Sequence, residues 1–166
     1  MKTNVIELNS GWEFARSEYV STERKPLSCE ESARLCWYEA TVPGSAQDDL
    51  RKLGQMDDPH YADNADHYRW CEEVDFWYRC SIDPMRTEPG SRLVLEFGGL
   101  DTFATIWIDG IQIGSHDNMF VRFSIDVTNH IRSDRPSELL IRFGAPAFES
   151  GFSDRDPGSH APPQRT

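Results

Sequence analysis

Long apolar runs are missing from this sequence. Nowhere in its 166 residues does it approach the roughly 20 apolar residues that a membrane-spanning helix needs. The amino terminus, MKTNVIELNSGW, contains one lysine but no apolar stretch of signal-peptide length. The sequence therefore predicts a soluble protein with no membrane partner, and we expect it in the cytoplasm.

Basic residues are also scarce. The chain has 17 lysines and arginines against 28 aspartates and glutamates, which gives a formal net charge of −11 at pH 7. A surface of this sign repels the phosphates of nucleic acids and of anionic membranes. We expect no nucleic-acid partner, and the simplest role of the charge is solubility. A neutral sugar remains an acceptable ligand.

Motifs for metals and cofactors are absent as well. No Cys-x-x-Cys pair, zinc-type spacing, Gly-x-Gly-x-x-Gly run or phosphate loop is present. We therefore expect no metal and no cofactor. In a cytoplasmic chain the thiols should be reduced, with Cys80 acting as a small apolar residue on the inward face of a strand. The four cysteines are Cys29, Cys36, Cys71 and Cys80.

What the sequence does contain is a clear strand pattern between Phe97 and Ile131. Thr102 to Asp109 alternates between two faces, which is the period of a strand. Asp109-Gly110 then predicts a tight hairpin turn, since this dipeptide tolerates the positive φ angles of a type I′ turn. Val121 to Val127 alternates again and predicts another half-buried strand. Such strands need a second sheet packed on them.

The rest of the chain extends this pattern. Ser45, three residues before Asp48, predicts the start of a short helix that stops at Gly54, and a helical turn is expected at Cys29 to Leu35. About eight strands without a βαβ rhythm predict an all-β fold, a jelly-roll β-sandwich with one short helix. The other expected strands are Trp12–Phe14, Trp37–Val42, Phe76–Ile82, Arg92–Phe97 and Ser137–Phe143.

The pattern also divides the chain into two parts. Residues 1–148 are predicted to form the sandwich domain. Residues 149–166 are rich in proline, glycine, serine and charge without apolar periodicity. That composition predicts a disordered tail or an interdomain linker.

The candidates for catalytic carboxylates are two acid pairs, Asp57-Asp58 and Glu72-Glu73. Retaining glycosidases need two carboxyl groups about 5 to 5.5 Å apart and converging on one sugar. Neighbours along a strand point to opposite faces instead. We interpret both pairs as solvated acids and assign no catalytic residue.

Several segments, in order along the chain, resemble the first domain of glycoside hydrolase family 2 enzymes, and more narrowly of β-mannosidases. They cover roughly residues 8 to 146. The resemblance implies a galactose-binding-like β-sandwich and a role in carbohydrate metabolism. The segments are LNSGWEF, ATVPGSAQDDLRKLGQMDDPHYADN, YRW, DFWYR, GGLDTFATIWIDGIQIGSHDNMF and FSIDVT.

In that family the two catalytic glutamates lie on a (β/α)₈ barrel well downstream of this domain, and no barrel is encoded before Thr166. The resemblance therefore implies a non-catalytic amino-terminal domain that packs on the barrel and other domains of a glycosidase and helps to wall the sugar pocket. The parent reaction would be retaining hydrolysis of terminal β-D-mannosides. The chain alone is expected to be inactive.

The resemblance also implies a substrate-facing segment, MDDPHYADNADHYRW, for a mannoside or a related oligosaccharide. Within it, Asp63 and Asn64 can hydrogen-bond to sugar hydroxyls, and Tyr61 or Trp70 can stack on a pyranose face. Two alternatives stay open. Asn64 could stabilise the loop through an Asx turn, and Trp70 could pack in the core. The family often has an acidic residue where this chain has Ala65.

Two other functions stay open. A free-standing carbohydrate-binding module would show an exposed aromatic platform, and a structural or partner-binding domain would show a contiguous exposed apolar patch. The run His116 to Phe120 resembles the family's Asn-Met-Phe signature. We interpret it as a loop that shapes the sandwich, with Met119 and Phe120 anchoring it by packing.

Overall fold

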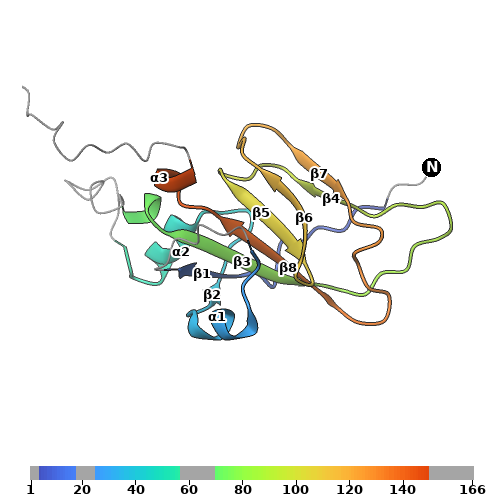
Figure 1. Ribbon diagram of the computed structural model, residues 1–166, viewed down its shortest axis with the longest axis horizontal. Coiled ribbons are helices and arrows are strands. Elements are labelled where there is room, and N and C mark those ends of the chain that lie inside the picture. Colours follow the sequence, from blue (N-terminus) through green and yellow to red (C-terminus); the bar gives the residue numbers. More distant parts are fainter. Residues whose placement is uncertain (1–3, 18–24, 57–69, 150–166) are drawn as a thin grey trace, which may run out of the picture.

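A six-stranded antiparallel sheet forms the larger layer of the protein, and a two-stranded sheet forms the smaller one. The computed structural model describes residues 4–17, 25–56 and 70–149 (Figure 1). The strands pair in the orders β2-β1-β3-β8-β5-β6 and β4-β7, which confirms the predicted all-β sandwich. Their bounds are β1 (Glu13–Ser17), β2 (Tyr38–Glu39), β3 (Asp75–Ile82), β4 (Val94–Phe97), β5 (Ala104–Ile108), β6 (Ile111–His116), β7 (Phe123–Asp126) and β8 (Ser137–Phe143).

Within the described ranges, three short helices accompany the sheets: α1 (Cys29–Arg34), α2 (Ala46–Lys52) and α3 (Pro146–Glu149). α2 is the helix predicted from Ser45, whose hydroxyl accepts a hydrogen bond from the Asp48 amide at 3.1 Å. α1 begins with a full capping box between Ser28 and Glu31. The sequence pattern indicated only a turn at α1 and gave no sign of α3, because neither helix has an apolar stripe.

The Asp109-Gly110 turn forms as predicted. Asp109 and Gly110 have φ angles of 48° and 78°, and Ile108 pairs with Ile111 across the turn. The Asp109 carboxylate then accepts a hydrogen bond from the Glu138 amide at 2.9 Å, which ties the hairpin to β8. We call this end of the sandwich the hairpin end.

The opposite end, which we call the loop end, follows from the strand register. β1 and β8 finish there and β3 begins there, because Ser17 lies opposite Asp75 and Phe76 lies opposite Phe143. The connections from β4 to β5 and from β6 to β7 also cross this end. In Figure 1 the loop end, with α3, is at the upper left, and the hairpin end is at the lower right.

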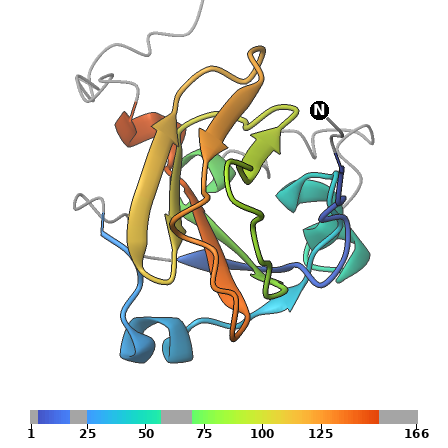
Figure 2. The ribbon, with the colours of Figure 1, turned by 90° about the vertical axis from the view of Figure 1, so that its right-hand side faces the viewer.

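The main core lies between the two sheets. Alternate residues of the large sheet, such as Phe14, Ile106 and Leu139, are almost fully buried on the face that β4 and β7 cover (Figure 2). The layers approach closely at Gly114 of β6, where an added Cβ would lie 2.9 Å from Cδ1 of Ile125. A larger residue there would have to displace the tips of the Ile125 and Phe123 side chains.

The other face of the large sheet is buried too. Trp77 and Trp107 stack with ring centroids 5.8 Å apart, and Leu27, Leu35 and Trp37 pack over them. β5 is therefore buried along both faces, whereas its alternation predicted a half-buried strand. The difference arises because the chain before β2 folds back over the sheet, a long-range contact that periodicity does not encode.

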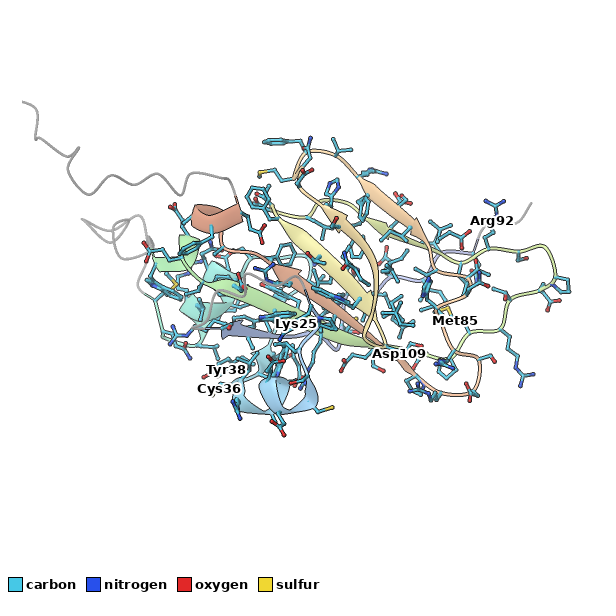
Figure 3. The ribbon with its side chains drawn as sticks, viewed as in Figure 1. Lys25, Cys36, Tyr38, Met85, Arg92 and Asp109 are labelled. Carbon is cyan, nitrogen blue, oxygen red and sulfur yellow. The ribbon has the colours of Figure 1, made fainter. Side chains whose placement is uncertain are left out.

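The cysteines separate into two classes. Cys29 and Cys36 are exposed, Cys71 and Cys80 are buried, and all four are free thiols. Cys36 is labelled in Figure 3. Burial raises the pKa of Cys71 to about 11 and that of Cys80 to about 12. Both buried thiols therefore stay protonated at neutral pH, as small apolar members of the core.

This difference gives a prediction for thiol chemistry. Iodoacetamide at pH 8 should modify two of the four cysteines in the folded protein, and mass spectrometry of peptides should place the label on Cys29 and Cys36. In urea all four should react. Rapid labelling of Cys80 in the folded state would contradict the buried assignment.

The raised pKa values of Cys71 and Cys80 also link stability to pH. The protonated thiols stabilise the fold fully below the ordinary thiol pKa, and this contribution should fade as the pH rises towards 11.

Candidate functional site

The loop end holds the only predicted sugar-contact residue that falls among the described residues. Asp63, Asn64 and Tyr61 lie outside the described ranges, so their roles stay predictions. Trp70 begins a short turn closed by a hydrogen bond from the Glu73 amide to its carbonyl at 3.0 Å. Its role in sugar binding also stays a prediction.

The Trp70 side chain is half-buried at the rim of the core. Its ring centroid lies 6.3 Å from that of Phe76, and the guanidinium of Arg16 lies 5.1 Å from the ring. Packing against β3 therefore holds the indole in place, as expected if Trp70 packs in the core. Part of the ring remains exposed to solvent. An aromatic edge of this kind can pack on an apolar surface or on a sugar.

The helix that precedes the predicted substrate-facing segment, α2, is also held in place by buried contacts. Asp49 of α2 is buried and accepts a hydrogen bond from the Thr41 amide at 2.7 Å, and its other oxygen lies 2.9 Å from Nζ of Lys52. Burial alone would raise the pKa of Asp49, but these hydrogen bonds hold it below its usual range. The positions of α2 and Trp70 are thus both set by buried contacts.

A buried ion pair organises the same end of the sheet. Nε and Nη2 of Arg142 in β8 donate to the two carboxylate oxygens of Asp75 in β3, at 2.8 and 3.1 Å. Asp75 also accepts from the Ala145 amide at 2.9 Å, and Nη1 of Arg142 reaches Glu149 of α3 at 2.9 Å. Burial alone would lower the pKa of Arg142, but Asp75 holds it above its ordinary value. The network fixes the path of the chain as it leaves β8.

The β6–β7 connection differs from its prediction. Phe120 was expected to anchor this loop by packing, but its side chain is 87% exposed. Met119 and Val121 beside it are also exposed. The expectation was wrong because polar contacts close the loop instead. Nε2 of His116 lies 2.6 Å from the Asn118 carbonyl, and the Phe120 amide donates to Oδ1 of Asn118 at 3.0 Å.

Acidic and metal-ligating side chains are scattered over the described part of the chain. Over residues 4–17, 25–56 and 70–149 no three His, Cys, Asp or Glu side chains gather as metal ligands. Glu72 and Glu73 are exposed, and Asp57-Asp58 lies outside the described residues. A hollow of about 350 Å³ lies at the hairpin end beside Asp109, a residue labelled in Figure 3. Four of its charged side chains are ion-paired, Arg79 with Glu13 and Arg135 with Asp109.

Comparison with known proteins gives the family. A model described as the glycosyl hydrolase 2 galactose-binding domain-like family matches residues 12–164. The chain belongs to this family. The resemblance drawn from its sequence segments is thereby confirmed.

Curated relatives of this galactose-binding-like domain are β-mannosidases. It is 32% identical over 137 residues to β-mannosidase B of Aspergillus clavatus, covering 82% of this chain and 15% of that protein. It is 36% identical over 105 residues to β-mannosidase of Rattus norvegicus, covering 63% of this chain and 12% of that protein. The domain thus corresponds to a small part of much longer proteins.

A solved structure agrees. β-D-mannosidase from Dictyoglomus thermophilum superposes with a TM-score of 0.70 at 29% identity, over 87% of this chain and 16% of that one. A β-glucuronidase from an uncultured Clostridium, at 23% identity and a TM-score of 0.55, shares the fold. The galactose-binding-like domain therefore matches one part of much longer β-mannosidases. Among the described residues no helix is both long and apolar enough to cross a bilayer.

Sequence reasoning missed the Arg142–Asp75 pair. The available signal was a charged residue inside an apolar strand, LLIRF, but nothing local identifies its partner, which is 67 residues away. Exposure of Phe120 was missed because its apolar character was taken to predict packing, although apolar residues also occur on the surface.

The ion pair yields a stability prediction. Arg142→Ala should lower the free energy of unfolding by about 3–5 kcal/mol, because it leaves the Asp75 carboxylate buried and unbalanced. The matched control is Arg122→Ala, which removes an exposed pair with Glu96 and should cost less than about 1 kcal/mol. Urea unfolding followed by tryptophan fluorescence measures both. Equal losses in the two variants would show that the buried pair has no special role.

Proposed function

We propose that this chain is the non-catalytic amino-terminal domain of a β-mannosidase-like family 2 glycosidase, which packs on the catalytic barrel and helps to wall its sugar pocket. The parent reaction is retaining hydrolysis of terminal β-D-mannosides. Family membership and β-mannosidase relatives that extend far beyond the matched region support this proposal.

One structural observation carries the proposal: the loop end gathers the elements that such a role requires. Trp70, the β4–β5 and β6–β7 connections and α3 all lie there. The chain leaves the sandwich at α3, so the polypeptide that follows starts from the same end.

The roles proposed for the sugar contacts follow from side-chain chemistry. Asp63 and Asn64 would bond to sugar hydroxyls, and Tyr61 and Trp70 would lie against the apolar face of the ring. Such groups position a substrate without taking part in bond cleavage. They complete a pocket only when the barrel supplies the catalytic carboxylates.

An activity assay of the purified chain alone is the first test of the non-catalytic role. Purified protein mixed with a chromogenic β-mannoside should release no product above the buffer rate, because the two converging carboxyl groups that hydrolysis requires are not supplied. Turnover that follows the protein through an additional purification step would overturn the non-catalytic role.

Titration calorimetry of the same protein with manno-oligosaccharides separates this proposal from a free-standing binding module. A partly built pocket should bind with a Kd weaker than about 1 mM. The half-exposed Trp70 gives the binding-module alternative its best support. A Kd in the micromolar range that Trp70→Ala abolishes would favour that alternative.

The sugar contact itself can be tested in a chimera. This domain replaces the matching domain of the Dictyoglomus thermophilum β-D-mannosidase, and Asn64→Ala is compared with Asn129→Ala, an exposed asparagine near the hairpin end. Loss of one substrate hydrogen bond should lower kcat/KM by about tenfold, mainly through KM. Asn129→Ala should change neither constant. Identical kinetics in the two variants would remove Asn64 from the pocket wall.

A further inference from the structure

Three consecutive apolar residues form an exposed tip on the β6–β7 loop, Met119, Phe120 and Val121, which we call the apolar tip. Phe120 is 87% exposed, and Val121 and Met119 are 51% and 39% exposed. Single exposed apolar residues are ordinary on soluble proteins, but a contiguous group is typical of an interaction surface. Since the tip contributes little packing to its own domain, the domain's fold does not explain it.

The apolar tip is held in a defined shape. Asn118 supports it from within, because its side chain accepts from the Phe120 amide at 3.0 Å and its carbonyl accepts from the Val121 amide at 3.3 Å. His116 bonds to the Asn118 carbonyl and stacks on Phe123 with ring centroids 4.6 Å apart. A preorganised loop loses less entropy on binding than a free one. The aromatic ring is thus presented to solvent by a built scaffold.

A second loop backs the first. At Gly99, in the β4–β5 connection, an added Cβ would lie 3.2 Å from the Met119 carbonyl, so the two connections are in close contact. Oδ1 of Asn118 and Nε2 of His116 are turned towards the loop's own backbone, and the exposed Arg122 beside the tip is ion-paired with Glu96. The three consecutive side chains of the tip itself are apolar, which fits an apolar protein pocket better than a sugar.

The direction of the chain identifies the occupant. α3, the last described element, lies at the same loop end, and its Phe148 is 57% exposed. Both views show α3 and the β6–β7 loop at this end (Figures 1 and 2). The β-mannosidase relatives continue far beyond the matched domain, which is 15% of the Aspergillus clavatus protein. The chain therefore leaves the described part of the domain at the same end as the apolar tip.

We infer that the apolar tip is the docking knob of this domain, and that Phe120 inserts into an apolar pocket of the polypeptide that follows α3 in a β-mannosidase-like protein. This inference rests on the proposed function and adds to it the surface that makes the contact. Phe148 of α3 extends the same contact beside the point where the chain leaves the domain.

The first experiment uses the 166-residue chain. Phe120→Ser should shift the thermal unfolding midpoint by no more than about 2 °C, because surface substitutions have small effects. The matched control is Ile111→Ser, which removes an exposed apolar side chain at the hairpin end. A large drop confined to Phe120→Ser would show that Phe120 stabilises its own domain, and would overturn the inference.

Light scattering of the same chain tests a second copy as the occupant. The chain should remain monomeric at a concentration of about 0.1 mM, since three side chains bury far less surface than a stable dimer needs. A dimer that Phe120→Ser dissociates would assign the tip to self-association and overturn the proposed partner.

The decisive experiment places both variants in the chimera with the Dictyoglomus thermophilum β-D-mannosidase. Phe120→Ser should speed thermal inactivation by about tenfold or more, the loss expected when one buried phenylalanine contact is removed. Ile111→Ser should leave the rate unchanged. Equal rates in the two variants would overturn the docking knob but leave the proposed function standing. A parent chimera whose domains unfold independently would contradict the proposed packing itself.

Discussion

Pairing of two buried charges, Arg142 and Asp75, sets the geometry on which the loop end depends. A guanidinium and a carboxylate removed from water are tolerated only with close mutual contact and further hydrogen bonds. Asp75 meets this requirement through both of its oxygens and the Ala145 amide, and Arg142 reaches on to Glu149. The start of β3, the end of β8 and α3 are consequently fixed relative to one another. Any surface that the domain presents at the loop end is therefore held in a defined position.

Burial on both faces of the large sheet serves the same purpose. The main core packs β4 and β7 against one face, while the stacked Trp77 and Trp107 fill the other beneath Trp37. Strands buried on both sides have little freedom to bend, because interiors are close-packed. A sheet of this kind is a firm base for loops that must meet another surface. The half-buried Trp70 and the exposed Phe120 both project from that base.

Local rules were enough for much of the fold. Alternation predicted β8 at Ser137–Phe143, the bounds found in the structure, and Asp109-Gly110 predicted its hairpin, because these features depend only on neighbouring residues. Contacts between distant segments were beyond such rules. The cover over Trp107 comes from residues about 70 to 80 positions earlier in the chain, and the partner of Arg142 is 67 residues away. The sugar-contact residues were named by family resemblance, and only Trp70 falls among the described residues.

The strand order has a mechanical consequence for the way the chain is threaded. β1 enters the large sheet at the hairpin end and β8 leaves it at the loop end, each hydrogen-bonded along its length to opposite sides of β3. Tension applied between the entry and the exit would slide β1 and β8 along β3 in opposite directions. The bonds of an antiparallel ladder run across the strands, so a sliding force loads many of them at once and does not open them one by one. Shear between the entry of β1 and the exit of β8 is therefore opposed by the whole ladder at once.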